Sequence, residues 1–69
     1  MHTDPTHGDF VVERLPTSAR FVVRREGISR LLQRQFDTYD GAVAFALESA
    51  NASDAHSFLQ SSDGWVRLD

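Results

Sequence analysis

Three runs in the first half of the chain are rich in strand-forming residues, and one of them alternates apolar and polar positions with a period of two. We expect strands over Phe10 to Leu15, Ala19 to Arg25 and Ile28 to Phe36. The first run ends at Pro16-Thr17-Ser18, where proline presets a turn and offers no amide to a strand ladder. Glu26-Gly27 supplies the reversal before the third run.

The alternation is clear in the second run and poor in the third. It places Phe21 and Val23 on one side, and Arg20, Val22 and Arg24 on the other. In the third run Leu31 and Leu32 are adjacent and cannot both face one side, so we expect a β-bulge there.

A helix is predicted after these strands. Thr38 can cap its first turn, and Asp37 and Asp40 lie near the positive end of the helix dipole. The apolar stripe consists of Ala42, Val43, Ala46, Leu47 and Ala50. Gly41 is a poor helix former, which indicates close packing or a frayed first turn, and we expect the helix to end at Asn51.

A hairpin is predicted at the end of the sequence. Ser57 to Ser62 and Trp65 to Leu68 flank Asp63-Gly64, which is typical of a two-residue turn. The expected pairs are Ser62 with Trp65, Gln60 with Arg67, and Leu59 with Leu68. On this reading Leu59, Val66 and Leu68 share one face of the hairpin, and Phe58 and Trp65 lie on the other.

Together these elements predict an α+β fold: a small antiparallel sheet of four to five strands, with one helix packed on one face. The order is three strands, the helix, then two strands. With 69 residues the chain has room for a single domain. We assign residues 9–69 to that domain and residues 1–8, which lack a periodic apolar pattern, to a mobile tail.

The composition also indicates a cellular compartment. The chain has no cysteine, which excludes disulfides and thiolate metal sites and favours a reducing cytoplasm. It also has no apolar run long enough to span a membrane, and its first ten residues have no secretion-signal pattern. We therefore expect a cytoplasmic protein without a membrane partner.

Charge is distributed unevenly along the sequence. Residues 14–34 hold six arginines and a single acid, Glu26, which gives a local charge of +5. Residues 35–69 hold six acids and a single base, Arg67, a local charge of −5, and residues 1–13 add −3. The net charge is −3, so the arginines form a basic stretch within an acidic chain.

Several short motifs resemble those of the domain of unknown function 2188 family, a small prokaryotic domain. They are the run Phe21 to Arg30 (FVVRREGISR), Phe36-Asp37-Thr38, Ala42-Val43 with Ala46, and Asp63-Gly64, within roughly residues 19 to 67. The resemblance implies three strands, one helix and one or two further strands, and it brings no assigned activity and no catalytic residues. Two departures are one extra residue between Gly27 and Thr38, and Gln60 where family members often have histidine.

One helix covers one face of such a sheet, so the other face is expected to be open. The candidate binding residues on or near the open face are Arg20, Val22, Arg24, Arg30, Arg34 and Trp65. Arginine and tryptophan are enriched at protein interfaces, which favours a protein partner or a second copy of the chain. The alternatives are nucleic-acid binding by the same arginines, which a net charge of −3 opposes, and an ordinary solvated face without a partner.

Catalysis is not predicted. Asp54, His56 and Ser57 are crowded into one connection, whereas a catalytic triad needs three groups that converge from a rigid fold. His2 and His7 fall in the tail and His56 stands alone, so no metal site is expected. The sequence also lacks a glycine-rich phosphate loop. We therefore expect a binding or accessory module that is not an enzyme and has no cofactor.

Overall fold

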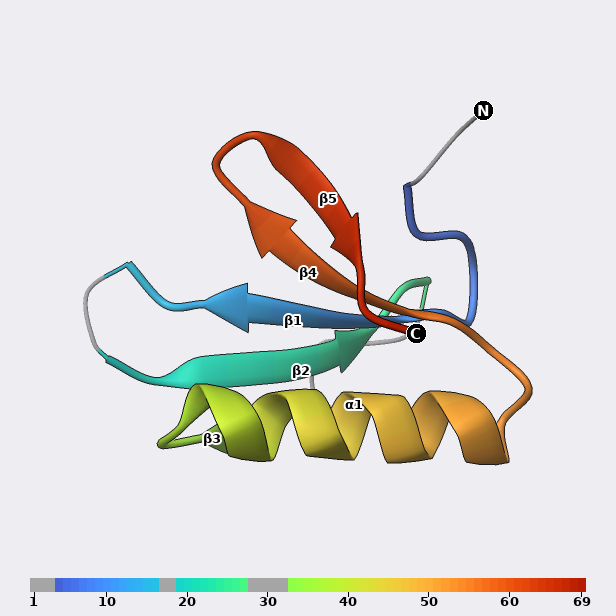
Figure 1. The fold of residues 1–69 in the computed structure, drawn as a ribbon, viewed down its shortest axis with the longest axis horizontal. Coiled ribbons are helices and arrows are strands. Elements are labelled where there is room, and N and C mark those ends of the chain that lie inside the picture. Colours follow the sequence, from blue (N-terminus) through green and yellow to red (C-terminus); the bar gives the residue numbers. More distant parts are fainter. Residues whose placement is uncertain (1–3, 17–18, 28–32) are drawn as a thin grey trace.

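Five strands and one helix make up the structure, a computed structural model that describes residues 4–16, 19–27 and 33–69. The elements are β1 (Phe10–Arg14), β2 (Phe21–Arg25), β3 (Arg34–Phe36), α1 (Tyr39–Ala52), β4 (Ser57–Ser61) and β5 (Gly64–Arg67). Figure 1 shows the sheet with α1 on one side of it. The predicted α+β class and the order of three strands, a helix and two strands are confirmed.

The sheet is mixed, whereas an antiparallel sheet was predicted. The strand order is β3-β2-β1-β4-β5, and β1 and β4 run parallel while the other neighbours are antiparallel. The difference arises from α1, which carries the chain back across the sheet so that β4 enters beside β1 in the same direction. β1 is therefore the central strand, with β2 and β4 on its two sides.

The core lies between α1 and the face of the sheet beneath it. Val12, Val23, Ala42 and Ala46 form its centre, with relative exposures of 0 to 2%. Six partly buried apolar residues surround this centre: Phe10, Phe21, Phe36, Phe45, Leu59 and Leu68. Within the described chain α1 contacts β1 to β4 and does not contact β5, so the outermost strand extends beyond the cover of the helix.

The start of α1 follows the prediction closely. Thr38 is the N-cap, and its hydroxyl oxygen accepts a hydrogen bond from the backbone N–H of Gly41 at 3.1 Å. A Cβ at Gly41 would lie 3.0 Å from the Thr38 Oγ1 and 3.5 Å from the Phe36 ring, so this glycine allows close packing. The helix ends at Ala52, one residue beyond the predicted end.

The third strand is shorter than its sequence pattern suggests. β3 covers Arg34–Phe36 and pairs with β2 through Phe21 and Phe36 among others. The bulge predicted at Leu31 and Leu32 lies outside the described residues.

The C-terminal hairpin forms with a register two residues away from the predicted one. The observed pairs are Phe58 with Arg67, Leu59 with Val66, Gln60 with Trp65, and Ser61 with Gly64. Ser62 and Asp63 therefore occupy the turn, and Gly64 begins β5 with a φ of +122°, which favours glycine. A shift of two residues keeps every side chain on its expected face.

The segment before β1 is bound to the end of the sheet. Gly8 N–H donates to the backbone oxygen of Glu26 at 2.8 Å, and the Arg25 Nε donates to the backbone oxygen of Gly8 at 2.8 Å. Asp9 is 5% exposed, and its carboxylate accepts hydrogen bonds from the backbone and hydroxyl of Thr6 and from His56 N–H. The predicted mobility of residues 1–8 stays a prediction, but Thr6 and Gly8 are hydrogen-bonded to the domain.

Candidate functional site

The face of the sheet turned away from α1, here called the outer face, carries the candidate binding residues. Because Val12 and Val23 pack beneath α1 and side chains alternate along a strand, their neighbours point to the other side. The register places on the outer face Val11, Glu13, Val22, Arg24, Gln35, Phe58, Gln60, Trp65 and Arg67. Val22, Arg24 and Trp65 therefore share a face, as expected.

An ion-pair network covers the β1–β2 part of the outer face. Arg24 pairs with Glu13, and its Nη1 lies 2.5 Å from the Glu26 Oε1. Since Arg24 is opposite Val11 and Glu13 is opposite Val22, the pair crosses diagonally over both valines. Burial lowers the pKa of Arg24, but the two carboxylates outweigh this effect and raise the pKa of the guanidinium above its usual range.

This network corrects the expected role of Val22. Val22 is 2% exposed, so it belongs to the interior and has little surface to offer a partner. The Arg24 side chain is 12% exposed and neutralised by two acids, so it braces the sheet. The middle of the outer face is therefore covered by side chains, since Val11 and Phe58 are also buried, at 0% and 4%.

The remaining predicted arginines lie apart from one another. The Arg20 Nη1 is 3.0 Å from the Asp37 Oδ1, and both side chains are well exposed. Arg34 is opposite Val23 in the register and thus on the α1 side, which contradicts the expectation that it lies on or near the outer face. Its guanidinium lies over the Phe36 and Phe45 rings, 5.8 and 5.3 Å from their centres. Arg30 lies outside the described residues.

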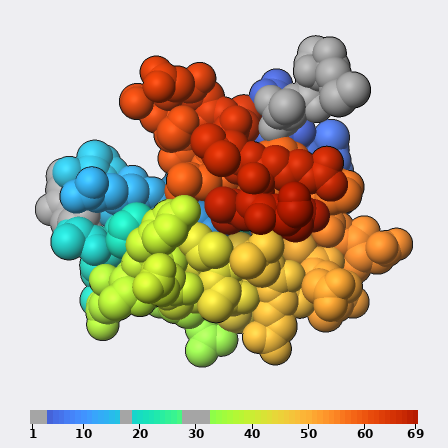
Figure 2. Space-filling model, in the orientation of Figure 1, coloured from blue at the N-terminus to red at the C-terminus, as the bar shows by residue number. Residues whose placement is uncertain are grey.

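Besides exposed Gln35 on β3, the outer face is accessible on the C-terminal hairpin. Gln60 and Arg67 are exposed, and Trp65 is half-buried opposite Gln60. We call these three residues the hairpin surface. In the space-filling view the hairpin tip rises clear of α1 (Figure 2). Val66 lies on the other side of β5 and is 48% exposed, because α1 does not reach this strand.

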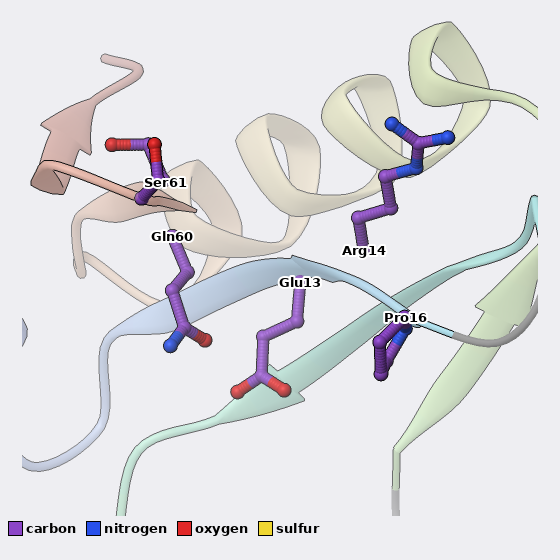
Figure 3. A pocket seen from close by; sticks show the side chains of 6 residues that line it. Glu13, Arg14, Pro16, Gln60 and Ser61 are labelled. Carbon is purple, nitrogen blue, oxygen red and sulfur yellow. The ribbon is translucent and has the colours of Figure 1, made fainter.

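A hollow adjoins the hairpin surface where β1 and β4 separate. The pairing of these parallel strands ends at Val12 and Leu59, and beyond it lies an open hollow of about 610 Å³. It is lined by Glu13, Arg14, Pro16, Gln60, Ser61 and Ser62. Figure 3 shows Glu13 and Gln60 projecting to the same side, with Arg14 directed to the opposite side. The lining offers charges of both signs, an amide and hydroxyls, which suit a polar segment of polypeptide.

A cluster of His56, Arg67 and Asp69 borders the hairpin surface, and the sequence pattern did not reveal it. The His56 Nδ1 is 2.9 Å from the Asp69 Oδ2 and 2.8 Å from the Arg67 Nη2. A protonated Nδ1 donates to Asp69, whereas a bare Nδ1 accepts from Arg67. The Arg67 Nε also donates to the Asp69 Oδ1 at 3.2 Å. The cluster therefore holds the guanidinium of Arg67 next to His56, the residue that directly precedes β4.

The Asp69 carboxylate has a strongly altered acidity. Burial raises its pKa, but hydrogen bonds from His56, from the Ser57 backbone and from Arg67 outweigh burial and lower the pKa to about 2. The only sequence clue was that Arg67 and Asp69 are two residues apart and hence point the same way from an extended chain.

The three residue types considered for catalysis do not form a triad. Ser57 is fully buried, and its hydroxyl has no hydrogen-bond partner within the described chain. His56 contacts Asp69 and Arg67, and Asp54 is an exposed residue with a φ of +55° at the end of α1. Within the described chain no base is therefore hydrogen-bonded to the Ser57 hydroxyl.

Comparison with known proteins gives no relative: no protein-family model, curated protein or solved structure matches the chain. Among the described residues, no helix has the length and apolar character needed to cross a membrane.

Proposed function

We propose that this chain is a small non-enzymatic module that recognises another protein through the hairpin surface and the hollow beside it. The observation that carries this proposal is the position of Trp65, half-buried on the outer face with exposed Gln60 opposite and exposed Arg67 on the same strand. Tryptophan and arginine are the residues that most often dominate binding energy at interfaces. A half-buried indole retains apolar area that a partner can remove from water.

The charge pairing of the arginines favours a protein partner over the nucleic-acid alternative. Three arginines have carboxylate partners: Arg20 with Asp37, Arg24 with Glu13 and Glu26, and Arg67 with Asp69. Nucleic-acid binding gains affinity when free cations replace the counterions of phosphates. Cations already neutralised by acids, in a chain of net charge −3, contribute little to that exchange.

For the compartment and the family we propose what the sequence indicates. We propose a cytoplasmic location because the chain has no cysteine. The resemblance to the domain of unknown function 2188 family, and the prokaryotic source that it implies, likewise stay proposals.

Site-specific photo-crosslinking tests the proposed recognition. A benzophenone side chain is introduced at Gln60, an exposed position of the hairpin surface, in the full chain expressed in its host. The matched control carries the same group at Ala44, an exposed position on α1. We expect discrete protein adducts from position 60 that weaken in a Trp65→Ala background and are absent from position 44.

Two results would contradict the proposal. Adducts from position 60 that contain nucleic acid in place of protein would favour the alternative function. Identical adducts from positions 60 and 44 would mean that the hairpin surface has no special role.

A further inference from the structure

We propose that the partner is a second copy of this chain, joined through the outer edge of β5 into a two-fold dimer with one continuous sheet. This inference rests on the proposed function, because the edge belongs to the strand that carries Trp65 and Arg67. It names the partner that the edge geometry fits best.

Among the described residues no strand pairs with the outer edge of β5, and the hydrogen bonds to β4 show which backbone groups face that edge. The Leu68 N–H donates to the Ser57 oxygen at 2.9 Å, so residues 66 and 68 direct their backbone groups toward β4. Because these groups alternate along a strand, those of Trp65 and Arg67 point outward. Two antiparallel copies can therefore form backbone hydrogen bonds only in registers that bring the outward groups of Trp65 and Arg67 opposite each other or opposite themselves.

Side-chain chemistry selects one of the possible two-fold registers. An axis at Arg67 places two guanidinium groups opposite each other, which is repulsive, and an axis at Trp65 requires Asp63 of the turn to continue the strand. An axis at Val66 sets Trp65 of each copy against Arg67 of the other. That register yields four backbone hydrogen bonds and two contacts between a guanidinium and an indole.

Val66, on the opposite face of β5 from Trp65 and Arg67, also suits this register. Val66 is 48% exposed and would meet Val66 of the second copy at the axis, in the closely spaced type of antiparallel pair. The opposite edge of the sheet is β3, which has only three residues.

A four-residue edge buries less area than a stable interface usually requires, so we expect weak, concentration-dependent association. Sedimentation of the full chain over a series of concentrations up to the millimolar range measures it. Val66→Lys places two like charges at the axis and should weaken dimerisation at least about tenfold. Ala44→Lys adds the same charge on the exposed side of α1 and should leave dimerisation unchanged.

Mixing two variants provides the sharpest arm of this experiment. Val66→Lys and Val66→Glu should each be monomeric alone and should associate when mixed, because the mixed axis pairs opposite charges. A wild type that stays monomeric at every concentration overturns the inference. Equal association of the wild type and Val66→Lys, or equal loss in Val66→Lys and Ala44→Lys, overturns it as well.

Cysteine substitution tests the register, since the chain has no cysteine of its own. Under mild oxidation Val66→Cys should form a disulfide-linked dimer, because the two Cα atoms at the axis would be about 4.5 Å apart. Arg67→Cys should crosslink far more slowly. Faster crosslinking of Arg67→Cys than of Val66→Cys would contradict this register.

The two proposals fail in distinguishable ways. Adducts from position 60 with a different protein, together with a monomeric wild type, would support recognition and overturn the second-copy inference. Self-adducts that disappear in Val66→Lys would support both.

Discussion

Arg20 and Arg24 are four residues apart in the sequence, but their side chains meet different surroundings. The Arg24 side chain is 12% exposed and lies between Glu13 and Glu26, whereas the side chains of the Arg20–Asp37 pair are 48% and 79% exposed. An exposed ion pair gains little because water screens it and ordering two long side chains costs entropy. Removing one member of a largely buried pair leaves a poorly solvated charge behind.

We therefore predict that the two arginines contribute unequally to stability. Arg24→Ala should lower the free energy of unfolding by about 2 to 4 kcal/mol, since it strands Glu13 over a buried part of the sheet. Arg20→Ala should lower it by less than about 1 kcal/mol. Urea unfolding followed by circular dichroism measures both, and equal losses in the two variants would show that the ion-pair network does not brace the sheet.

At the scale of elements, α1 depends on how its first turn is capped. Thr38 accepts from Gly41 N–H, and the hydroxyl sits where a Cβ on Gly41 would crowd it. The helix also buries only small side chains against the sheet, the alanines at positions 42, 46 and 50. The core beneath α1 therefore has little apolar volume, and the stability of the helix depends more on its cap.

We predict that Thr38→Ala destabilises the domain by about 1 kcal/mol, because one N–H of the first turn loses its acceptor. Thr38→Ser, which keeps the hydroxyl, should stay within a few tenths of a kcal/mol of the wild type. Thermal unfolding of the three proteins side by side provides the measurement. A Thr38→Ser variant as unstable as Thr38→Ala would contradict the capping role.

Local sequence patterns predicted the elements better than the relations between them. The N-cap, the face of Trp65 and the hairpin depend on neighbouring residues, and the sequence specifies them directly. The parallel pairing of β1 with β4 depends on residues 47 positions apart, such as Phe10 and Ser57, and alternation within one strand does not encode a partner. The burial of Val22 was missed for a related reason, because it requires Arg24 to reach Glu13 across two strands.

At the scale of the whole molecule, two carboxylates join distant parts of the chain at one end of the sheet. Asp9 binds His56 N–H and the segment before β1, and Asp69 binds His56 and Ser57 N–H from beyond β5. Burial raises the pKa of Asp9, but hydrogen bonds from Thr6 and His56 outweigh it and lower the pKa below 3.8. Both acids therefore favour the folded state in their ionised form.

This arrangement predicts a particular response to acid. An acid whose folded pKa is lowered contributes its full stabilisation above the unfolded pKa and loses it as the pH falls through the folded pKa. For Asp69 that window runs from 3.8 down to about 2, and the Asp9 contribution fades below 3.8. The double variant Asp9→Asn, Asp69→Asn should be less stable at neutral pH, by about 1 to 3 kcal/mol from Asp9 alone, and should lose stability less steeply in acid.

Urea unfolding at a series of pH values tests this response. The control is the double variant Asp4→Asn, Asp63→Asn, which removes two exposed carboxylates and so changes the net charge by the same amount. Its acid profile should match the wild type. Parallel profiles for the wild type and the Asp9, Asp69 variant would contradict the role assigned to these two acids.

The central position of β1 also bears on how the chain emerges from the ribosome. β1 is made first, and β2 can cover one of its edges soon afterwards. Its second edge waits for β4, which follows the whole of α1. A nascent chain that stops short of residue 57 therefore exposes a bare strand edge in the middle of its future sheet, and this is the stage at which it is most open to pairing with a wrong strand.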